Sequence, residues 1–454
     1  MEYHGVVTTA ETTTTPALRT IDLRGRQLSW AELRAAVPRQ STSSLASAEQ
    51  AVEEIIAAVR TEGAAALRRY ALRFDGVEQQ RLRVDPAEIR RAVDALDPAV
   101  RRGLETAIER TRAFAAAQRP ADARLEVAPG AVHVQRWTPI RRAGLYVPGG
   151  LAVYPSSVVM NVVPAQAAGV GSIALCSPPQ REFGGLPHPT ILAAAGLLGV
   201  EEVWAVGGAQ SLAAMAHGVV DGEDVLEPVD TVTGPGNVYV ATAKRLLRSV
   251  VGVDAEAGTT EIAVLADDTA DPSYVAADLI SQAEHDPAAG SVLITHSPAL
   301  AERVAAELAV QVPRTRHRER VATALSGPQS GVVLTDDLDA SVAVADAYAA
   351  EHLEIHTAAP QEVAARVRNA GAIFVGPYSP VPLGDYAAGS NHVLPTGGTA
   401  VHTQGLSTTS FLKAVQIVEY SKEALAEIGA DIVALADSED LPAHGTAITI
   451  RTGG

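Results

Sequence analysis

The spacing of apolar residues changes near residue 140. Between residues 46 and 118 apolar positions recur every three or four residues, as in the stripe Val52, Ile55, Ile56 and Val59, which predicts amphipathic helices. Asp and Pro start signals open the helical segments "DPAEIRRAVDAL" and "PAVRRGLETAIERTRAFAAAQ". From about residue 143, short continuous apolar runs alternate with helical segments. This second pattern is typical of buried parallel strands joined by helices.

The alternation forms two consecutive series. The first contains the strand-like runs "AGLYVPG", "GSIALCS", "EEVWAVG" and "DTVTGPG", with helices between them and "VGVDAEAG" at its end. The second begins at Thr260 and contains "EIAVLAD", "SVLITHS", "GVVLTDD", "LEIHTA" and "AIFVGP", separated by helices at 272–285, 298–309, 339–350 and 360–370. The two series predict an α/β protein with two Rossmann-like doubly wound parallel-sheet domains. Small N-terminal and C-terminal helical extensions flank them, and the last run, "GTAITIR", resembles a strand.

This organisation predicts four parts of the chain. Residues 1–44 form an N-terminal extension that is partly flexible, because it contains a threonine cluster. Residues 45–142 together with 259–405 form the first α/β domain, and residues 143–258 form the second. Residues 406–454 form a C-terminal extension.

Charge and cysteine content narrow the classes of function. With 36 Lys and Arg against 53 Asp and Glu, the formal net charge is -17, so the surface repels nucleic acid. The single cysteine, Cys176, excludes an intrachain disulfide and lies in an apolar run, so we expect a core residue. Neither a secretory signal nor a membrane-spanning stretch is visible, which predicts a cytoplasmic enzyme without a membrane partner.

Three short segments carry groups suited to catalysis or metal binding. Gln282 and His285 share one face near a helix end, a pattern that taken alone also fits an ordinary solvated helix end. Glu351 and His352 are an adjacent acid and imidazole between a helix and a strand, and could transfer protons. The glycine-rich stretch 382–400 contains Asp385, a candidate metal ligand, although it could equally be a surface loop.

Glycine-containing loops offer a second type of site. The stretches "VGGAQ" at 206–210 and "TGPGN" at 233–237 each stand between a predicted strand and a predicted helix. Backbone N–H groups at such helix starts can hold a diphosphate, although many glycines only make turns. Ligands of α/β sheets bind at the carboxyl ends of the strands, so we expect the polar loops to gather there.

Taken together, six long motifs identify a family resemblance. The segment 253–286, "VDAEAGTTEIAVLADDTADPSYVAADLISQAEHD", resembles the signature of histidinol dehydrogenases. So do "AGLYVPGG", "VGGAQSLAA", "TGPGNVYVATAKR", "AEHLEI" and "GDYAAGSNHVLPT", which occur in the order of that family. One departure is Thr259-Thr260, where the family commonly has Pro-Ser; the hydroxyl is kept at residue 260.

The resemblance implies an NAD-dependent, zinc-containing homodimer that oxidises L-histidinol to L-histidine through an aldehyde, with active sites shared between subunits. Residues 143–258 would then bind NAD, and 406–454 would serve dimerisation. Carried over, the zinc ligands are Gln282, His285, Asp385 and His444. The catalytic pair is Glu351 and His352, and the NAD contacts are Tyr146, Gln210 and Asn237. The substrate contacts are Thr260, Gln282, His285, His352, Asp385, Glu439 and His444, with His392 at the border of the pocket.

Two other functions also fit parts of the sequence. A zinc hydrolase could use a similar metal set with a neighbouring Glu to activate water. A non-catalytic binding protein could have two α/β lobes, although it would not need an acid and imidazole beside a metal set. The glycine-containing loops favour a dinucleotide enzyme over both.

Overall fold

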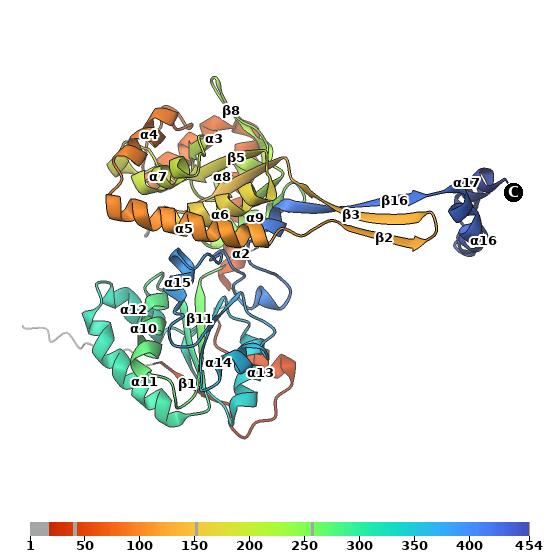
Figure 1. Ribbon diagram of the computed structural model, residues 1–454. Coiled ribbons are helices and arrows are strands. Elements are labelled where there is room, and N and C mark those ends of the chain that lie inside the picture. The colour runs from red at the N-terminus through yellow and green to blue at the C-terminus, as the bar shows by residue number, and fades with distance from the viewer. Residues whose placement is uncertain (1–17, 40–42, 150–152, 256–257, 454) are drawn as a thin grey trace, which may run out of the picture.

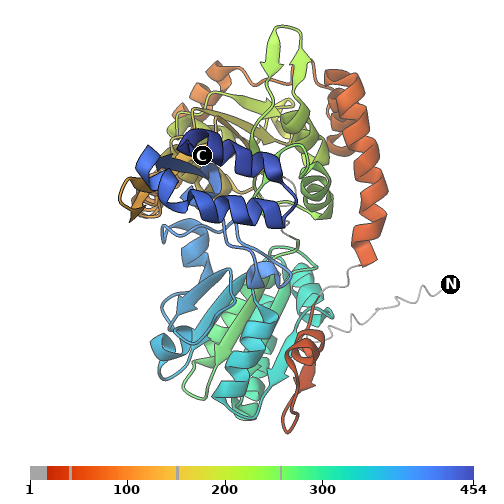
Figure 2. The same ribbon diagram turned by 90° about the vertical axis from the view of Figure 1, so that its right-hand side faces the viewer.

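Two lobes, each built around a parallel β-sheet, make up the body of the molecule (Figure 1). The computed structural model describes residues 18–39, 43–149, 153–255 and 258–453. A long arm leaves one lobe and carries two helices at its tip, and Figure 2 views the molecule with the arm pointing toward the reader. The prediction of an α/β fold with two parallel sheets is confirmed.

The first lobe contains a five-stranded sheet in the order β10-β9-β4-β5-β6, in which every neighbouring pair is parallel. Its strands are β4 (Arg142–Tyr146), β5 (Ser172–Ser177), β6 (Val203–Ala205), β9 (Thr231–Thr233) and β10 (Gly252–Val253). Its crossover helices are α6 (Pro155–Ala168), α7 (Pro189–Leu197), α8 (Gly208–His217) and α9 (Val238–Leu247). From β4 the chain first adds β5 and β6 on one side, and later adds β9 and β10 on the other side. The strand order therefore reverses between β4 and β9.

The N-terminal helices cover this same sheet, which corrects one prediction. They are α2 (Ser43–Glu62), α3 (Ala64–Tyr70), α4 (Pro86–Asp94) and α5 (Pro98–Ala117). Helix α2 packs on α8 and α9, while α4 packs on α7 and α5 on α6. The assignment of residues 45–142 to one domain with 259–405 was therefore wrong. The stripe containing Val52 and Val59 is buried as expected. Such a stripe predicts which face of the helix is buried, but it does not predict which sheet that face packs on.

The second lobe contains a six-stranded parallel sheet in the order β1-β13-β12-β11-β14-β15. Its strands are β1 (Thr20–Asp22), β11 (Glu261–Ala266), β12 (Gly290–Thr295), β13 (Gly331–Leu334), β14 (His352–His356) and β15 (Ala372–Val375). Its helices are α1 (Trp30–Ala36), α10 (Pro272–Ala283), α11 (Pro298–Gln311), α12 (Arg318–Ser326), α13 (Leu338–Tyr348), α14 (Pro360–Ala364) and α15 (Val381–Tyr386). The predicted N-terminal extension thus contributes an edge strand. The threonine cluster lies outside the described residues.

The arm is antiparallel and was not predicted. It consists of β2 (Ala123–Ala128), β3 (Ala131–Pro139) and β16 (Leu412–Tyr420), and a separate small hairpin joins β7 (Val219–Asp221) to β8 (Asp224–Leu226). Short turns of 3₁₀ or π-helix complete the structure at η1 (Ala71–Asp75), η2 (Arg181–Phe183), η3 (Val312–Arg314), η4 (Thr399–Val401) and η5 (Thr408–Phe411).

At the tip of the arm, α16 (Lys422–Ser438) and α17 (Pro442–Thr452) pack on each other (Figure 1). Two predictions were wrong here: residues 412–420 form a strand where a helical tail was expected, and the strand-like run after His444 is helical. A Cβ on Gly429 would lie 3.3 Å from Ile448, and one on Gly445 would lie 3.4 Å from Val433. The first distance is slightly tighter than ordinary van der Waals contact and the second is ordinary contact, so the two helices pack closely here. This packing outweighs the β-propensity of the isoleucines.

Both sheets are buried on their two faces, as their continuous apolar sequences require. In the first lobe one face packs under α4 to α7 and the other under α2, α3, α8 and α9. Cys176 is a core residue, as predicted, and burial raises the pKa of its thiol. Within the part of the chain that the structure describes, no helix combines the length and the apolar composition needed to cross a bilayer.

Candidate active site

The predicted catalytic residues lie at the amino ends of the strands of the six-stranded sheet. His352 is the first residue of β14 and lies opposite Ile262 of the neighbouring β11. Glu261 is the first residue of β11 and directly precedes Ile262. Helix α10 runs back from the carboxyl edge and brings Gln282 to the same end. The expectation of a site at the carboxyl ends was wrong for this lobe, because the residues come from helix ends and strand starts instead of from the loops that follow strands.

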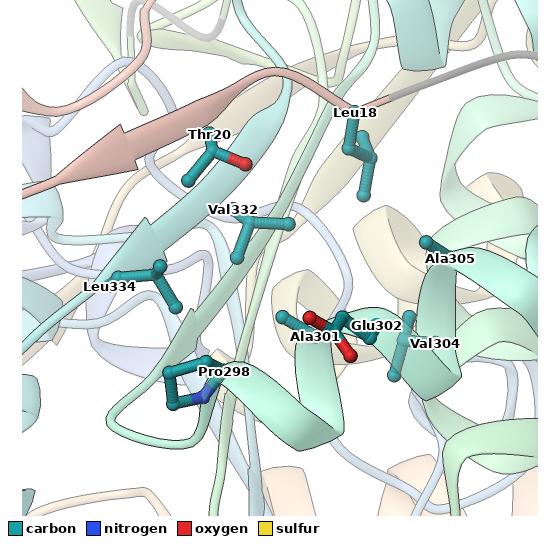
Figure 3. A pocket seen from close by; sticks show the side chains of 9 residues that line it. All are labelled: Leu18, Thr20, Pro298, Ala301, Glu302, Val304, Ala305, Val332 and Leu334. Carbon is teal, nitrogen blue, oxygen red and sulfur yellow. The ribbon is translucent and has the colours of Figure 1, made fainter.

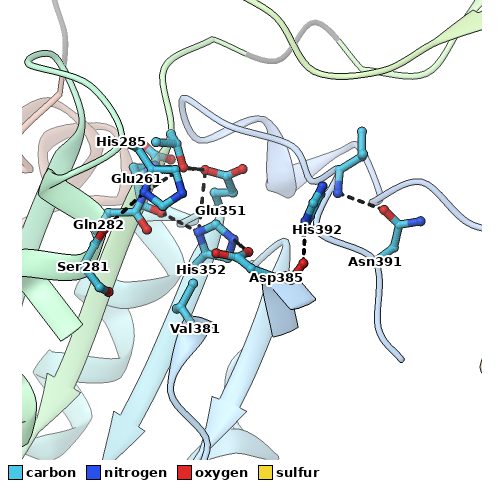
Figure 4. Close-up of polar contacts among 12 residues, drawn as sticks. Glu261, Ser281, Gln282, His285, Glu351, His352, Val381, Asp385, Asn391 and His392 are labelled. Atoms are coloured by element: carbon cyan, nitrogen blue, oxygen red, sulfur yellow. Dashed lines mark hydrogen bonds and ion pairs between the residues drawn. The ribbon is translucent and has the colours of Figure 1, made fainter. Parts of the chain in front are cut away.

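A short chain of hydrogen bonds holds Glu351 (Figure 4). Its Oε2 accepts from the Thr260 hydroxyl at 2.6 Å and from the Glu261 backbone N–H at 2.9 Å. The Gln282 amide in turn donates to the Thr260 oxygen at 2.6 Å. Burial raises the pKa of Glu351 to about 7, and the two hydrogen bonds only partly offset that effect. This carboxyl group can therefore take up or release a proton near neutral pH.

His352 is buried, with one ring nitrogen held and the other without a hydrogen-bond partner. Its Nδ1 lies 3.3 Å from the carbonyl oxygen of Glu261, which can only accept, so Nδ1 carries the proton. Nε2 makes no hydrogen bond within the described part of the chain and lies 3.8 Å from Oδ1 of Asp385. Burial lowers the pKa of His352. The imidazole thus stays neutral, and Nε2 has a lone pair ready to accept a proton.

Three of the four predicted zinc ligands surround His352 (Figure 4). The carbonyl oxygen Oε1 of Gln282 is buried without a hydrogen-bond partner, which leaves it free to bind a cation. His285 uses Nδ1 toward the Ser281 carbonyl at 3.2 Å, which leaves its Nε2 free. With the Asp385 carboxylate these groups supply one nitrogen and two oxygen donors, a set that Zn²⁺ accepts. One further donor would complete four-coordination.

His444, the fourth predicted ligand, does not join this group within one chain. It lies in α17 and Glu439 ends α16, so both are at the tip of the arm, away from the lobes (Figure 1). Both side chains are exposed. A single chain therefore presents three of the four donors in one place.

Contacts between the lobes surround the site. The ring of Tyr154, which precedes α6, is nearly parallel to the His285 ring, with centroids 6.3 Å apart. His392 lies between the Ser157 hydroxyl, 2.9 Å from its Nε2, and the Asp385 carbonyl, 3.0 Å from its Nδ1. Asn391 donates to the backbone of Met160 at 2.7 Å. His392 is thus at the border of the group, as predicted, and connects it to the other lobe.

The residues predicted to contact NAD lie at the carboxyl edge of the five-stranded sheet. Tyr146 ends β4 and its hydroxyl accepts from the Gly208 N–H at 3.2 Å, at the start of α8. Gln210 is buried in the first turn of α8, and Asn237 caps α9 by accepting from two backbone N–H groups. The two glycine loops therefore stand between a strand and a helix, as predicted. Both loops lie against Tyr146 at the end of β4, beside the point where the strand order reverses, which is the usual ligand position in such sheets.

A buried ion pair fixes one of these loops. Lys244 of α9 donates to Asp254 and to the carbonyl of Gly234, each at 2.5 Å, and the other Asp254 oxygen accepts from the Gly234 N–H at 2.9 Å. Gly234 has φ +121, and a Cβ there would come within 1.9 Å of the Tyr146 carbonyl. Only glycine fits this approach of loop and strand.

Several residues around the site were missed from sequence. The backbone of Glu261 binds both Glu351 and His352, and no side-chain pattern could have indicated that role. The alternation of His352, Glu354 and His356 along β14 could have indicated a polar strand face.

A pocket of about 240 Å³ elsewhere in this lobe is mostly apolar and offers no comparable chemistry (Figure 3). It is lined by Leu18, Thr20, Pro298, Ala301, Glu302, Val304, Ala305, Val332 and Leu334.

Comparison with known proteins gives a consistent result. A family model described as histidinol dehydrogenase matches residues 38–452. A histidinol dehydrogenase of Nocardia farcinica is 60% identical over 435 residues, covering 96% of this chain and 98% of the relative, and one of Thermobifida fusca is 60% identical over 431 residues, covering 95% and 97%. A crystal structure of histidinol dehydrogenase from Elizabethkingia anophelis superposes with a TM-score of 0.88 at 31% identity, covering 96% of this chain and 98% of that one.

Proposed function

The chain belongs to the histidinol dehydrogenase family, and from that premise we propose that it oxidises L-histidinol to L-histidine with NAD, through L-histidinal, at the end of histidine biosynthesis. The observation that carries the proposal is the gathering of Gln282, His285 and Asp385 around the Glu351-His352 pair. A cytoplasmic location remains a prediction.

The donor set also supports zinc as the resident metal. Gln282 Oε1, His285 Nε2 and Asp385 would hold it, and the unpartnered Gln282 oxygen fits this role. When bound, zinc would orient the amino and imidazole groups of the substrate, a positioning role.

His352 is proposed as the general base. The alcohol must lose its proton while hydride leaves the carbon, and Nε2 of His352 is neutral, buried and free of hydrogen bonds. Glu261 holds the opposite nitrogen and fixes the ring tautomer. The same nitrogen can act again in the second oxidation. A buried base within reach of the substrate hydroxyl is the standard requirement for this step.

Glu351 is proposed to activate water in the second oxidation. The aldehyde must add water before it can release a second hydride, and a carboxylate can accept the proton from that water. A pKa near 7 leaves a large fraction of this group ionised at neutral pH. Thr260 and the Glu261 N–H hold one carboxylate oxygen, which leaves the other for water.

The glycine loops at Gly208 and Gly234 are proposed to hold NAD. Each loop leads into the N-terminus of a helix, whose partial positive charge suits a diphosphate, and Tyr146, Gln210 and Asn237 lie around these helix starts. When bound, NAD would accept the two hydrides.

A homodimer with shared active sites is proposed from the position of His444. The arm carries this residue away from its own lobes, so within one chain the predicted fourth ligand does not reach the other three. A second copy could supply His444, with Glu439 as a substrate contact.

The activity is tested with purified protein, L-histidinol and NAD. We expect NADH absorbance to rise by two equivalents for each L-histidinol, to stop after treatment with a chelator, and to return when Zn²⁺ is added. Release of product from an ester or amide substrate without NAD reduction would instead indicate a zinc hydrolase. Binding of L-histidinol without any turnover would indicate a binding protein.

Mixed dimers test the shared site. We expect His352→Asn and His444→Ala each to be inactive as homodimers, and the mixed dimer to recover part of the activity. One of its two sites would then have both His352 and His444. The measurement is NADH formation after joint refolding of the two variants, with each refolded alone as the control. No recovery in dimers proven to be mixed would contradict donation of His444 across the dimer.

A further inference from the structure

A second group of ionisable side chains lies deeper in the same lobe. In β14, His352, Glu354 and His356 alternate along the strand and therefore share one face. On α10, Asp278 precedes Gln282 by four residues, which places it one helical turn further from the active site. The facing surfaces of this strand and helix thus carry the catalytic residues at one end and Asp278, Glu354 and His356 further inside.

The three inner side chains converge. Nε2 of His356 lies 3.4 Å from Oε2 of Glu354 and 3.9 Å from Oδ2 of Asp278. One ligand atom from each residue can be chosen so that all lie within 4.8 Å of one another, and among the described residues this is the one such group of three or more His, Cys, Asp or Glu side chains. Separations of 3.4 to 3.9 Å are close to those between ligands that share a cation about 2.0–2.2 Å away.

Burial makes this arrangement costly unless a cation is present. Asp278 is 8% exposed, Glu354 0% and His356 3%. Oε2 of Glu354 and both ring nitrogens of His356 lack hydrogen-bond partners among the described residues, and a buried polar group without a partner is destabilising. A proton shared by the two carboxyl groups would relieve their mutual repulsion, but it would leave the imidazole without a partner.

We propose that Asp278, Glu354 and His356 bind a divalent transition-metal cation, separate from the zinc proposed above. Two carboxylates and one neutral imidazole suit Zn²⁺ or Mn²⁺, and their two negative charges balance the cation. Such an ion would give the two carboxylates and Nε2 of His356 a common partner.

The proposed cation has a structural consequence for the active site. The other oxygen of Glu354, Oε1, accepts from the backbone N–H of Val381 at 2.7 Å. Val381 begins α15, the short helix that carries Asp385. A cation that fixes Glu354 would therefore also fix the start of this helix, and with it the position of the Asp385 carboxylate. The inner site is thus a positioning element.

Metal content tests this site. The full-length protein is purified without chelator from cells supplied with Zn²⁺ or Mn²⁺, and divalent metals per chain are measured by mass spectrometry. We expect His356→Leu and Asp278→Leu each to lose one equivalent relative to the wild type, because leucine offers no ligand atom. His296→Leu, a histidine replaced elsewhere in the same lobe, should keep the wild-type content. Wild-type content in a folded His356→Leu or Asp278→Leu protein would overturn the proposal.

A second measurement separates this site from the one that contains His285. In the His285→Ala background, Zn²⁺ or Mn²⁺ added to the chelator-treated protein should raise Tm, because the inner site remains. The added His356→Leu change should abolish that shift. If His285→Ala alone removes all metal and all of the Tm shift, the inner site does not exist. The proposed dehydrogenase function would be unaffected by that outcome, since the active-site zinc is assayed through activity.

Discussion

Replacing His352 by Asn lowers kcat by about 10²–10⁴-fold, the usual contribution of a general base. The Asn amide can still donate to the Glu261 carbonyl, as Nδ1 of the histidine does at 3.3 Å, so the fold is kept. It has no lone pair that accepts a proton at neutral pH in place of Nε2. The metal content stays at the wild-type value, because His352 is not among the proposed ligands.

The measurement is the steady-state rate of NADH formation from L-histidinol, with metal content determined on the same sample. His296→Asn is the matched control: it makes the same chemical change in the same lobe, outside the candidate active site, and should keep wild-type turnover. A His352→Asn protein with wild-type kcat would remove His352 from the mechanism.

Replacing Lys244 by Met lowers the free energy of unfolding of the first lobe by about 3–5 kcal/mol, the usual effect of removing one partner of a buried ion pair. The side chains of Lys244 and Asp254 are only 2% and 4% exposed. Met keeps most of the packing of the lysine stem, but it leaves the Asp254 carboxylate buried, with the Gly234 N–H as its remaining hydrogen-bond donor among the described residues.

Denaturant unfolding followed by circular dichroism measures this effect. Adding Asp254→Asn should recover part of the loss, because the amide oxygen can still accept from Gly234 while the unpaired charge is gone. Arg101→Met is the control, since it removes an exposed pair with Glu105 at 2.9 Å and should change stability by at most about 0.5 kcal/mol. Equal effects of Lys244→Met and Arg101→Met would show that the buried pair adds no stability.

The local pattern predicted most elements of both sheets correctly. Continuous apolar runs marked β4, β5, β11 and β12 because parallel strands are buried on both faces. The pattern failed where partners distant in sequence decide the outcome. Strand β16 forms because it pairs with β3 along its whole length, and α17 is helical because it packs on α16.

For the candidate site, sequence motifs indicated residue identities but not their arrangement. Gln282, His285 and Asp385 were expected together from family resemblance, and the structure places them around His352. The edge of the sheet was predicted wrongly, and the inner cluster of Asp278, Glu354 and His356 was not predicted at all. Asp278 lies 76 residues before Glu354, so spacing along the chain could indicate the polar face of β14 but not that Asp278 converges on it.

By itself, the sequence determined the fold class, the family and the types of side chain available for chemistry, because apolar periodicity and local motifs are properties of neighbouring residues. The tertiary structure alone decided which lobe receives the N-terminal helices, which nitrogen of His352 is free, and that the arm carries His444 away from its own lobes. Each of these depends on contacts between distant segments and on burial, which sets the protonation of Glu351 and His352.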